Sequence, residues 1–247
     1  MRKFYAAHFS RVGSFFIVIA ACALIASAQD FSDAQKNLSS EESVAASKSA
    51  PLDDAYNKRN EFSVWAAYAP DIPRLFSGSR RSTFGEIGFQ YARRIATSRN
   101  VALKYTIDAI PFAVLSFRRE LLIQATPTTF GYDRPRETAY GIGLTPVGFQ
   151  LNFLRQRKIQ PFITANAGLI SFNKSVPDDR SPLRPDRRGR QFNFTLAGGG
   201  GVEFLTEEGR SVRVGFKFHH ISNASTGNIN PGFDQNLFYV GYTFKKF

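Results

Sequence analysis

Apolar and polar residues alternate in short stretches along most of the chain after residue 60. Between residues 212 and 222, for example, Val212, Val214 and Phe216 alternate with Arg213 and Lys217. Because neighbouring side chains on a β-strand point to opposite faces, this pattern predicts strands with one apolar face. The same alternation recurs in seven further stretches: 62–66, 86–94, 101–107, 138–153, 159–172, 192–204 and 234–244. No apolar stripe with helical spacing and useful length follows residue 60, so an all-β protein is expected.

The connections between these stretches fall into two classes that alternate along the chain. Three are short, at residues 96–100, 154–157 and 206–209, and four are long, at residues 70–82, 112–136, 173–189 and 223–233. Short periplasmic turns and long extracellular loops are typical of outer-membrane barrels, and a tilted strand of roughly ten residues spans the membrane. A soluble, lipocalin-like barrel has no reason for this alternation. The sequence therefore predicts an eight-stranded antiparallel up-and-down transmembrane β-barrel.

The alternation is interrupted at a few points. Its phase slips near Thr145 and Pro146, which predicts a β-bulge. Phe247 is out of phase with Phe244, so we expect residues 245–247 to overhang the last strand. The run 198–201 consists of four glycines in mid-strand with no helix after it. We interpret it as a place of close packing or sharp curvature and not as a phosphate-binding loop.

The face opposite the apolar one carries charges of both signs. Its members include Glu86, Arg94, Lys104, Asp108, Glu203, Arg213 and Lys217. Side chains just fill the interior of an eight-stranded barrel. We therefore expect these charges to pair inside a plugged lumen, and we do not expect a diffusion pore.

The first sixty residues differ from the rest. Basic residues precede an apolar run at 15–25, and Ala26-Ser27-Ala28 follows it, which predicts a secretory signal peptide over residues 1–28. A lipoprotein cleavage box at Ile19-Ala20-Ala21-Cys22 is the alternative. Residues 29–60 are rich in Ser, Ala, Lys, Asp and Glu, so a disordered polar arm is expected there. Residues 61–247 are left for the barrel.

Removal of the signal peptide changes both the chemistry and the charge of the chain. The mature chain loses Cys22, its only cysteine, so neither a disulfide nor a thiol nucleophile is expected. Three basic residues and no acidic ones leave with the peptide, so the net charge falls from +12 to +9. A basic surface fits an anionic partner. For an exported chain, a phosphorylated lipid surface is a better partner than nucleic acid.

Three polar residues continue the apolar face of the last two predicted strands. His220 and Ser222 follow Phe218 in phase, and Asp234 begins the next strand on the same face. With both termini periplasmic, these residues would lie at the outer-leaflet interface, on the lipid side. A serine needs a base to take its proton, and a carboxylate orients the imidazole of that base. The pattern predicts ester hydrolysis at the membrane surface.

Other candidate residues surround this group. Asn223 and the main-chain amides of the turn 223–227 are candidate oxyanion donors, on position alone. Arg180, Arg184, Arg187 and Arg188 lie in the third long loop, where they are either solvated loop charges or ligands of lipid phosphates. His219 faces the lumen and is expected to have a structural role.

These residues also carry a resemblance to a known family. His220-Ile221-Ser222-Asn223-Ala224, then Asn230-Pro231-Gly232 and Asp234, at the end of a small barrel, resembles the PagL-like lipid A deacylases, which are grouped with acyloxyacyl hydrolases. The resemblance implies Ser222 as nucleophile, His220 as base and Asp234 as the acidic partner. It also implies removal of the ester-linked 3-hydroxyacyl chain at position 3 of lipid A, in lipopolysaccharide, with no metal or cofactor needed. Aspartate replaces the glutamate of the family pattern, so the geometry of that position is in question.

Two hypotheses from different classes follow. The first is an outer-membrane serine esterase that deacylates lipid A in the outer leaflet. The second is a non-catalytic eight-stranded barrel that binds lipid or stabilises the membrane, in which His220 and Ser222 are merely polar residues where a strand leaves the membrane. An esterase or phospholipase that acts on another lipid is a third possibility, because acyl specificity lies in loop and groove shapes.

Overall fold

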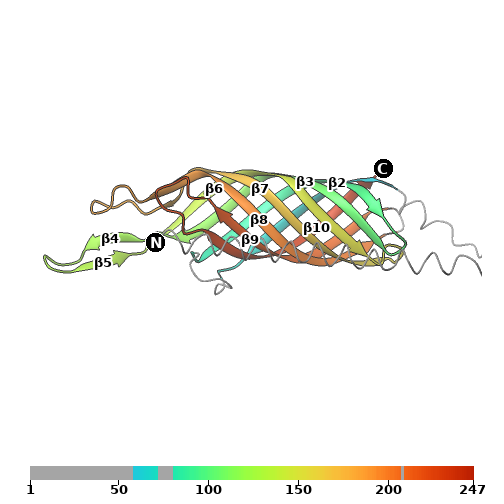
Figure 1. The fold of residues 1–247 in the computed structure, drawn as a ribbon. Coiled ribbons are helices and arrows are strands. Elements are labelled where there is room, and N and C mark those ends of the chain that lie inside the picture. Colours follow the sequence, from blue (N-terminus) through green and yellow to red (C-terminus); the bar gives the residue numbers. More distant parts are fainter. Residues whose placement is uncertain (1–57, 72–79, 207–208) are drawn as a thin grey trace, which may run out of the picture. The chain divides into compact units, whose positions relative to one another are not determined.

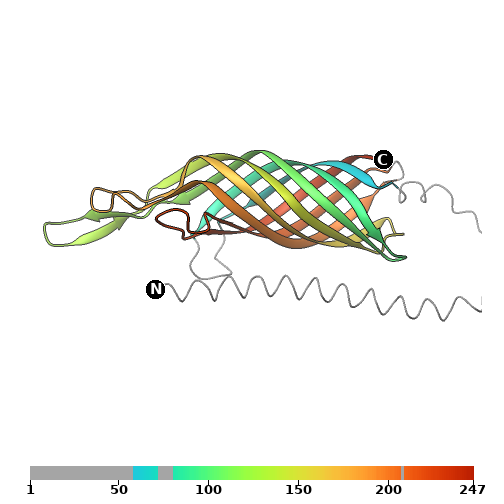
Figure 2. The same ribbon diagram turned by 45° about the horizontal axis from the view of Figure 1, so that its top comes forward.

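The barrel consists of eight strands that close on themselves. In the computed structural model, residues 58–71, 80–206 and 209–247 are described, and the expected signal peptide and nearly all of the polar arm lie outside them. The barrel strands are β1 (Asn60–Ala69), β2 (Ser82–Thr97), β3 (Val101–Arg118), β6 (Arg136–Phe153), β7 (Ile159–Asp178), β8 (Arg188–Leu205), β9 (Ser211–Ser222) and β10 (Phe233–Lys246). Figures 1 and 2 show these strands tilted around a common axis. No helix among the described residues is long and apolar enough to cross a membrane.

All neighbouring strands of the barrel run antiparallel. Their order around the ring is β1-β10-β9-β8-β7-β6-β3-β2, so each strand pairs with its neighbour in sequence and β1 closes the ring against β10. The expected up-and-down, eight-stranded antiparallel barrel is thus confirmed. The slip expected at Thr145 and Pro146 is present as well, because the register between β6 and β7 shifts between Leu144 and Val147.

The two ends of the barrel differ. The connections at residues 98–100, 154–158 and 206–210 form one end, the short-turn end, and the long loops form the other, the long-loop end. The start of β1 and the end of β10, which close the ring, lie at the short-turn end. There the N–H of Asn60 donates to the carbonyl oxygen of Phe247 at 2.9 Å. Figure 1 shows the C-terminus at this end.

Several strands are longer than the sequence indicated. β3 continues to Arg118 and β7 to Asp178, through residues that were expected to be loop. The expected loop 112–136 also contains a separate hairpin of β4 (Leu121–Gln124) and β5 (Phe130–Asp133), which projects past the barrel in Figure 1. Main-chain pairing between strands continues past the apolar band without any need for alternating side chains. The sequence pattern therefore revealed only the part of each strand that carries the apolar face.

The C-terminus is a further correction. Residues 245–247 do not overhang, because the register between β1 and β10 shifts between Phe62 and Ser63 and restores their phase. Lys246 therefore points inward, where its Nζ lies 3.3 Å from Glu203 Oε1. Phe247 lies outside and stacks on Phe62 with ring centroids 5.7 Å apart.

The outer and inner faces have opposite chemistry. Large apolar side chains are exposed around the outside, among them Ile142, Phe216, Phe238 and Val240. Their exposure is a large cost in water and none in a bilayer, so this face is the lipid-contacting surface.

Charged and polar side chains fill the lumen in a connected network. Lys104 Nζ lies 2.9 Å from Glu61 Oε2 and 3.2 Å from Glu203 Oε2. Asp108 Oδ1 accepts hydrogen bonds from Trp65 Nε1 at 2.8 Å and Gln90 Nε2 at 2.9 Å. Buried charges are stable when they are paired in this way. A lumen cavity lined by Trp65, Gln90, Gln150, Thr164, Arg213, Lys217 and Tyr239 has a volume of about 10 Å³, which is room for roughly one water molecule.

An apolar cluster closes the interior toward the long-loop end. It includes Phe84, Leu115, Phe117, Ile221 and Phe233. Phe117 packs edge-on against Phe233 with centroids 5.3 Å apart. The residue after Phe233 is Asp234, so this packing fixes the start of β10 at the point where the candidate acidic residue leaves the core.

Candidate active site

His220 and Asp234 lie directly opposite each other on neighbouring antiparallel strands. In the register of β9 and β10, His220 is the partner of Asp234, and Phe218 is the partner of Asn236. His220 Nδ1 is 2.6 Å from Asp234 Oδ1. Side chains that are paired in this way lie on the same face of a sheet, here the outer one, where His220 alternates with the buried His219 and Ile221. This pair therefore stands on the lipid side of the barrel, near the long-loop end.

The contact with Asp234 uses Nδ1 of His220 and leaves Nε2 for a second hydrogen bond. Because Nδ1 is engaged by the carboxylate, the ring is held in one orientation and Nε2 is available to a hydroxyl group. The aspartate side chain reaches the ring although it is one methylene shorter than the glutamate of the family pattern. Its position directly across from His220 removes the need for the longer side chain.

Ser222 shares the face of His220 but is more enclosed. It is the last residue of β9 and pairs with Phe194 of β8, which itself begins six residues earlier at Arg188. Ser222 is only 6% exposed. In the part of the chain that the structure describes, no hydrogen bond joins Ser222 Oγ to His220. Residues two apart on a strand are separated by roughly 7 Å at their Cα atoms, so the ring must lean along the strand to reach the hydroxyl.

Gly232 lies against the imidazole from the other side. Its φ of +70° is in the left-handed region, and a Cβ at this position would lie 3.0 Å from His220 Cε1. Glycine accepts this backbone conformation at little cost and leaves space for the ring. The turn motif Asn230-Pro231-Gly232 thus has a structural role, because it places the start of β10 next to the imidazole of His220.

The loop after Ser222 is tightly hydrogen-bonded. Asn223 is 1% exposed. Its N–H donates to Asn230 Oδ1 at 3.0 Å, and its Nδ2 donates to the carbonyl oxygen of Ile229 at 2.8 Å. The main-chain N–H and one hydrogen of the side-chain amide of Asn223 therefore hold the loop together. The next two residues, Ala224 and Ser225, have positive φ values of 50° and 63°, and their N–H groups donate to no acceptor among the described residues.

A family comparison matches most of this region. The model of the family described as "Lipid A 3-O-deacylase (PagL)" matches residues 101–243, which is more than half of the chain and includes His220, Ser222 and Asp234. The chain belongs to the lipid A 3-O-deacylase (PagL) family. It is accordingly an outer-membrane protein of bacteria and a lipid A deacylase, with lipid A of lipopolysaccharide as its substrate. In this family setting the long-loop end is extracellular and the short-turn end periplasmic.

Comparisons with solved structures and curated sequences gave fewer details. The crystal structure of the outer membrane enzyme PagL has 18% sequence identity and a TM-score of 0.47, and covers 74% of this chain and 99% of that chain. The Yersinia pestis outer membrane protein Ail has 12% identity and a TM-score of 0.34, covering 76% and 100%. No curated sequence was similar enough to count as a match.

The arginines of this deacylase's third long loop lie next to the loop after Ser222. The N–H of Asn228 donates to the carbonyl oxygen of Arg188 at 3.0 Å, and Arg190 Nε donates to that of Thr226 at 2.8 Å. Arg188 Nε also donates to Ser175 Oγ at 2.8 Å. Two loops that are distant in sequence thus form one surface beside the candidate site, which sequence spacing could not reveal.

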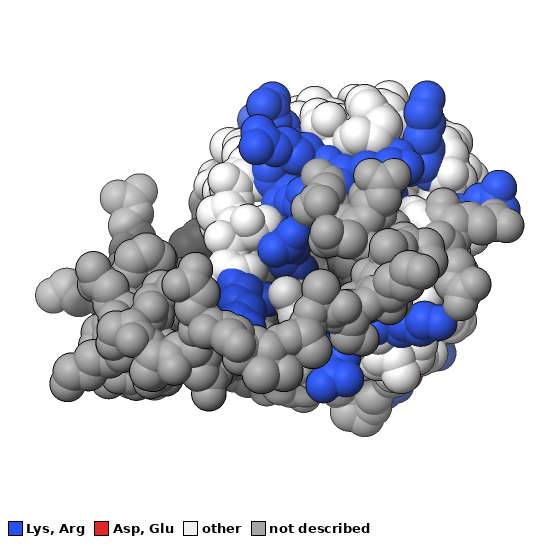
Figure 3. Space-filling model, turned by 90° about the vertical axis from the view of Figure 1, so that its right-hand side faces the viewer, with Lys and Arg blue, Asp and Glu red and all other residues white. Residues whose placement is uncertain are grey.

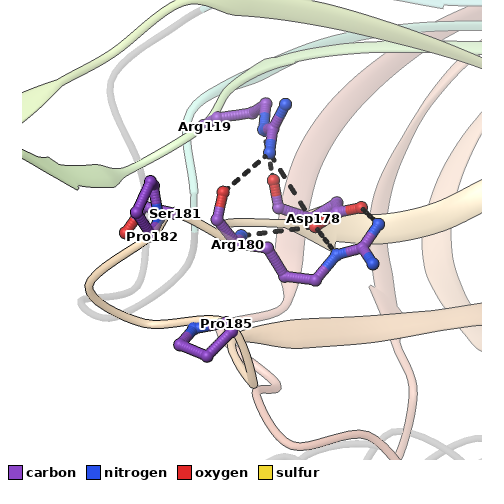
Figure 4. A pocket seen from close by; sticks show the side chains of 6 residues that line it. All are labelled: Arg119, Asp178, Arg180, Ser181, Pro182 and Pro185. Atoms are coloured by element: carbon purple, nitrogen blue, oxygen red, sulfur yellow. Dashed lines mark hydrogen bonds and ion pairs between the residues drawn. The ribbon is translucent and has the colours of Figure 1, made fainter.

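Arg180 lies in a shallow pocket of the same region and is paired. The pocket is lined by Arg119, Asp178, Arg180, Ser181, Pro182 and Pro185 (Figure 4). Arg180 Nε donates to Asp178 Oδ1 at 2.8 Å and Nη2 to Oδ2 at 2.6 Å. This hydrogen-bonded pair lowers the pKa of the Asp178 carboxyl below its ordinary value. Among the described residues, no group of three His, Cys, Asp or Glu side chains is placed to hold a metal ion.

Proposed function

We propose that the chain removes the 3-O-linked hydroxyacyl group of lipid A with Ser222 as nucleophile, His220 as general base and Asp234 as the residue that orients His220. The observation that carries this proposal is the 2.6 Å contact between His220 Nδ1 and Asp234 Oδ1 on the lipid-facing side of the barrel. The ester lies at the interface between the sugar and the acyl chains, which is the level at which β9 ends.

The reaction would begin with a proton transfer from Ser222 Oγ to His220 Nε2. The hydroxyl oxygen then attacks the ester carbonyl carbon, and a tetrahedral intermediate with a negative oxygen forms. Collapse of the intermediate breaks the bond to the sugar oxygen, which takes the proton from Nε2 and leaves as a hydroxyl. Water, deprotonated by His220, then attacks the acyl-serine carbonyl, and the bond to Ser222 Oγ breaks as His220 returns the proton to that oxygen, which releases the fatty acid and restores the enzyme. Asp234 stabilises the imidazolium at each step.

The negative oxygen needs hydrogen-bond donors close to Ser222. The N–H groups of Ala224 and Ser225 donate to no acceptor among the described residues, whereas the main-chain N–H of Asn223 and one hydrogen of its Nδ2 hold the loop. We assign stabilisation of the oxyanion to these two amides. Asn223 contributes by holding the loop that carries them. Residues with positive φ often occur at functional sites, because the surrounding structure must maintain them.

The loop arginines are the candidate ligands of the lipid A phosphates. Arg188 lies on the surface shared with the loop after Ser222, so its side chain is within the same region as the ester. Arg180 would have to exchange its contact with Asp178 for one with a phosphate. Arg184 and Arg187 lie in the turn of this loop, where the N–H of Arg187 donates to the carbonyl oxygen of Arg184. Arginine binds phosphate well because its planar group offers paired donors.

Mass spectrometry of lipid A tests the chemistry directly. Cells that express the wild type should yield lipid A lacking one 3-hydroxyacyl chain, and Ser222→Ala and His220→Asn should each abolish this loss. Ser98→Ala, in a turn at the opposite end of the barrel, is the matched hydroxyl control and should remain active. If Ser222→Ala still sheds the chain, Ser222 is not the nucleophile. If the wild type sheds no acyl chain, the non-catalytic barrel is the correct reading.

A further inference from the structure

The periplasmic end of the barrel is strongly basic. Arg59, Arg93, Arg99, Arg157 and Lys245 are all exposed there, on four different connections or strand ends, and we call them the basic rim. Figure 3 looks onto this end and shows lysine and arginine side chains around it, with no acidic side chain among the residues it colours. Arg210 and Lys158 add further charge at the same end.

Among the described residues, the acidic side chains near the rim are buried. Glu61 and Glu203 are buried in the lumen, where each is paired with Lys104 and Lys246. Glu207 and Glu208 occur in the turn between β8 and β9, outside the described residues. The rim therefore presents positive charge toward whatever surrounds the barrel at this level.

Aromatic residues show where this level lies in the membrane. Phe62 packs against Tyr91 at 5.4 Å, and Tyr105 packs against Phe149 at 5.7 Å, all on the outer face near the short-turn end. Such aromatic girdles mark the boundary between hydrocarbon and head groups. Arg93 is two residues beyond Tyr91 and is paired with Tyr105 across the strands. It thus lies on the lipid-facing wall, beside the aromatic girdle.

Lys245 has the same placement on the other side of β1. It is the cross-strand partner of Phe62, and the shifted register of β10 keeps it exposed. Arg59 directly precedes β1, next to the ring-closing hydrogen bonds with Phe247. The rim is therefore not a set of loop charges in open solvent. Part of it lies on the lipid-facing wall, directly beyond the aromatic girdle.

We propose that the basic rim binds the phosphate head groups of anionic glycerophospholipids in the periplasmic leaflet. Positive charges next to a membrane attract anionic lipids within about a Debye length of the surface. Since cations surround the barrel on several sides, binding involves a shell of lipids and not one enclosed molecule. The rim fixes the depth of the barrel in the bilayer, and thereby the depth of Ser222 near the opposite end of the barrel. The proposal does not depend on the esterase chemistry.

Lipid selectivity around the barrel is the direct test. The mature, full-length protein is placed in nanodiscs of phosphatidylcholine that contain a spin-labelled probe, either phosphatidylglycerol or phosphatidylcholine. Electron paramagnetic resonance then measures the fraction of each probe that the protein immobilises. We expect a roughly two- to fivefold preference for the anionic probe, which added salt weakens.

A charge-matched pair of variants locates the preference. Replacing Arg93, Arg99, Arg157 and Lys245 together by Gln should remove most of it. Replacing the same number of extracellular arginines, Arg81, Arg118, Arg134 and Arg136, by Gln should leave most of it. Circular dichroism checks that both variants fold.

Three outcomes would overturn the proposal. One is equal immobilisation of the two probes by the wild type. A second is a preference that survives loss of the rim charges or disappears equally in the extracellular variant. A third is retention of the wild type on purified peptidoglycan without lipid selectivity, which would assign the rim to the cell wall.

Discussion

The N–H of Arg80 donates a 3.0 Å hydrogen bond to the carbonyl oxygen of Gly232, and so ties the start of β2 to the residue that packs against the imidazole of His220. The guanidinium of Arg80 is in turn bound at two points by the buried carboxylate of Asp179, with Nη1 at 2.7 Å from Oδ1. Asp179 also accepts from the N–H of Glu120 at 3.0 Å. One buried ion pair thus joins three extracellular loops around the candidate site.

Loss of Arg80 should therefore affect both stability and catalysis. Arg80→Ala leaves Asp179 buried without a counter-ion, which we expect to cost about 3–5 kcal/mol in the free energy of unfolding. Urea unfolding of the protein in lipid vesicles measures this cost. The main-chain N–H that donates to Gly232 remains in Arg80→Ala, but the segment that carries it loses its side-chain anchor on Asp179. We therefore expect kcat, measured on purified lipid A, to fall more than KM rises. Arg81→Ala is the control, since Arg81 is exposed and makes only a surface pair with Asp71.

The double variant distinguishes the loss of the ion pair from the cost of leaving one charge buried without a partner. Replacing Arg80 and Asp179 together by Ala should recover part of the lost stability, because no unpaired charge remains. If Arg80→Ala and Arg81→Ala had the same small effect, the idea that the ion pair anchors the loops would be wrong.

The acidic partner of His220 gives a second prediction. Asp234→Asn keeps the shape of the side chain but not its charge, and we expect kcat to fall by about 10²–10⁴-fold. Asp234→Glu should keep a larger share of the activity, since the carboxylate can still reach Nδ1 after a small shift of the ring. Initial rates of fatty acid release measure both. Equal rates for Asp234→Asn and the wild type would exclude Asp234 from the mechanism.

Gly232 gives a third prediction. Gly232→Ala places a methyl group 3.0 Å from His220 Cε1 on a backbone with a φ of +70°. We expect about 1–2 kcal/mol of destabilisation and a loss of kcat as the imidazole is displaced. Gly131→Ala is the control, because a Cβ there meets only Ala125 Cβ, at 3.8 Å, in the distant β4–β5 hairpin. Full activity of Gly232→Ala would show that the ring does not depend on this contact.

The pair of Asp178 and Arg180 gives a prediction about pH. The pKa of Asp178 is lowered from its ordinary value of 3.8, first by the hydrogen bond from Arg180. The stabilisation from this pair is therefore present above pH 3.8 and is lost as the pH falls through the lowered pKa of the folded protein. Arg180→Gln should raise the pKa of Asp178 toward its ordinary value. NMR titration of labelled aspartate carboxyls measures this shift, and an unchanged value would mean that Arg180 does not pair with Asp178 in solution.

Alternation of side chains was enough to predict the barrel and the face of each candidate residue. Val212 to Ser222 and Asp234 to Phe244 lie on the faces that a period of two assigns to them, because register and pleat leave no other choice once one face must meet lipid. The prediction failed where no such constraint acts. Strands continue beyond the apolar band, β4 and β5 form a hairpin in an expected loop, and a bulge brings Lys246 back into phase.

The sequence by itself determined the barrel, the outward face of His220 and the residues that could pair with it, since these follow from local periodicity and from a short span of chain. Only the tertiary structure decided that Asp234 stands directly across from His220, that Ser222 is enclosed, and that Asn223 is occupied within its own loop. It alone also revealed Arg80 and Asp179, which are 99 positions apart in the chain. Contacts of that kind depend on which strands become neighbours when the ring closes, and no local pattern of residues records that.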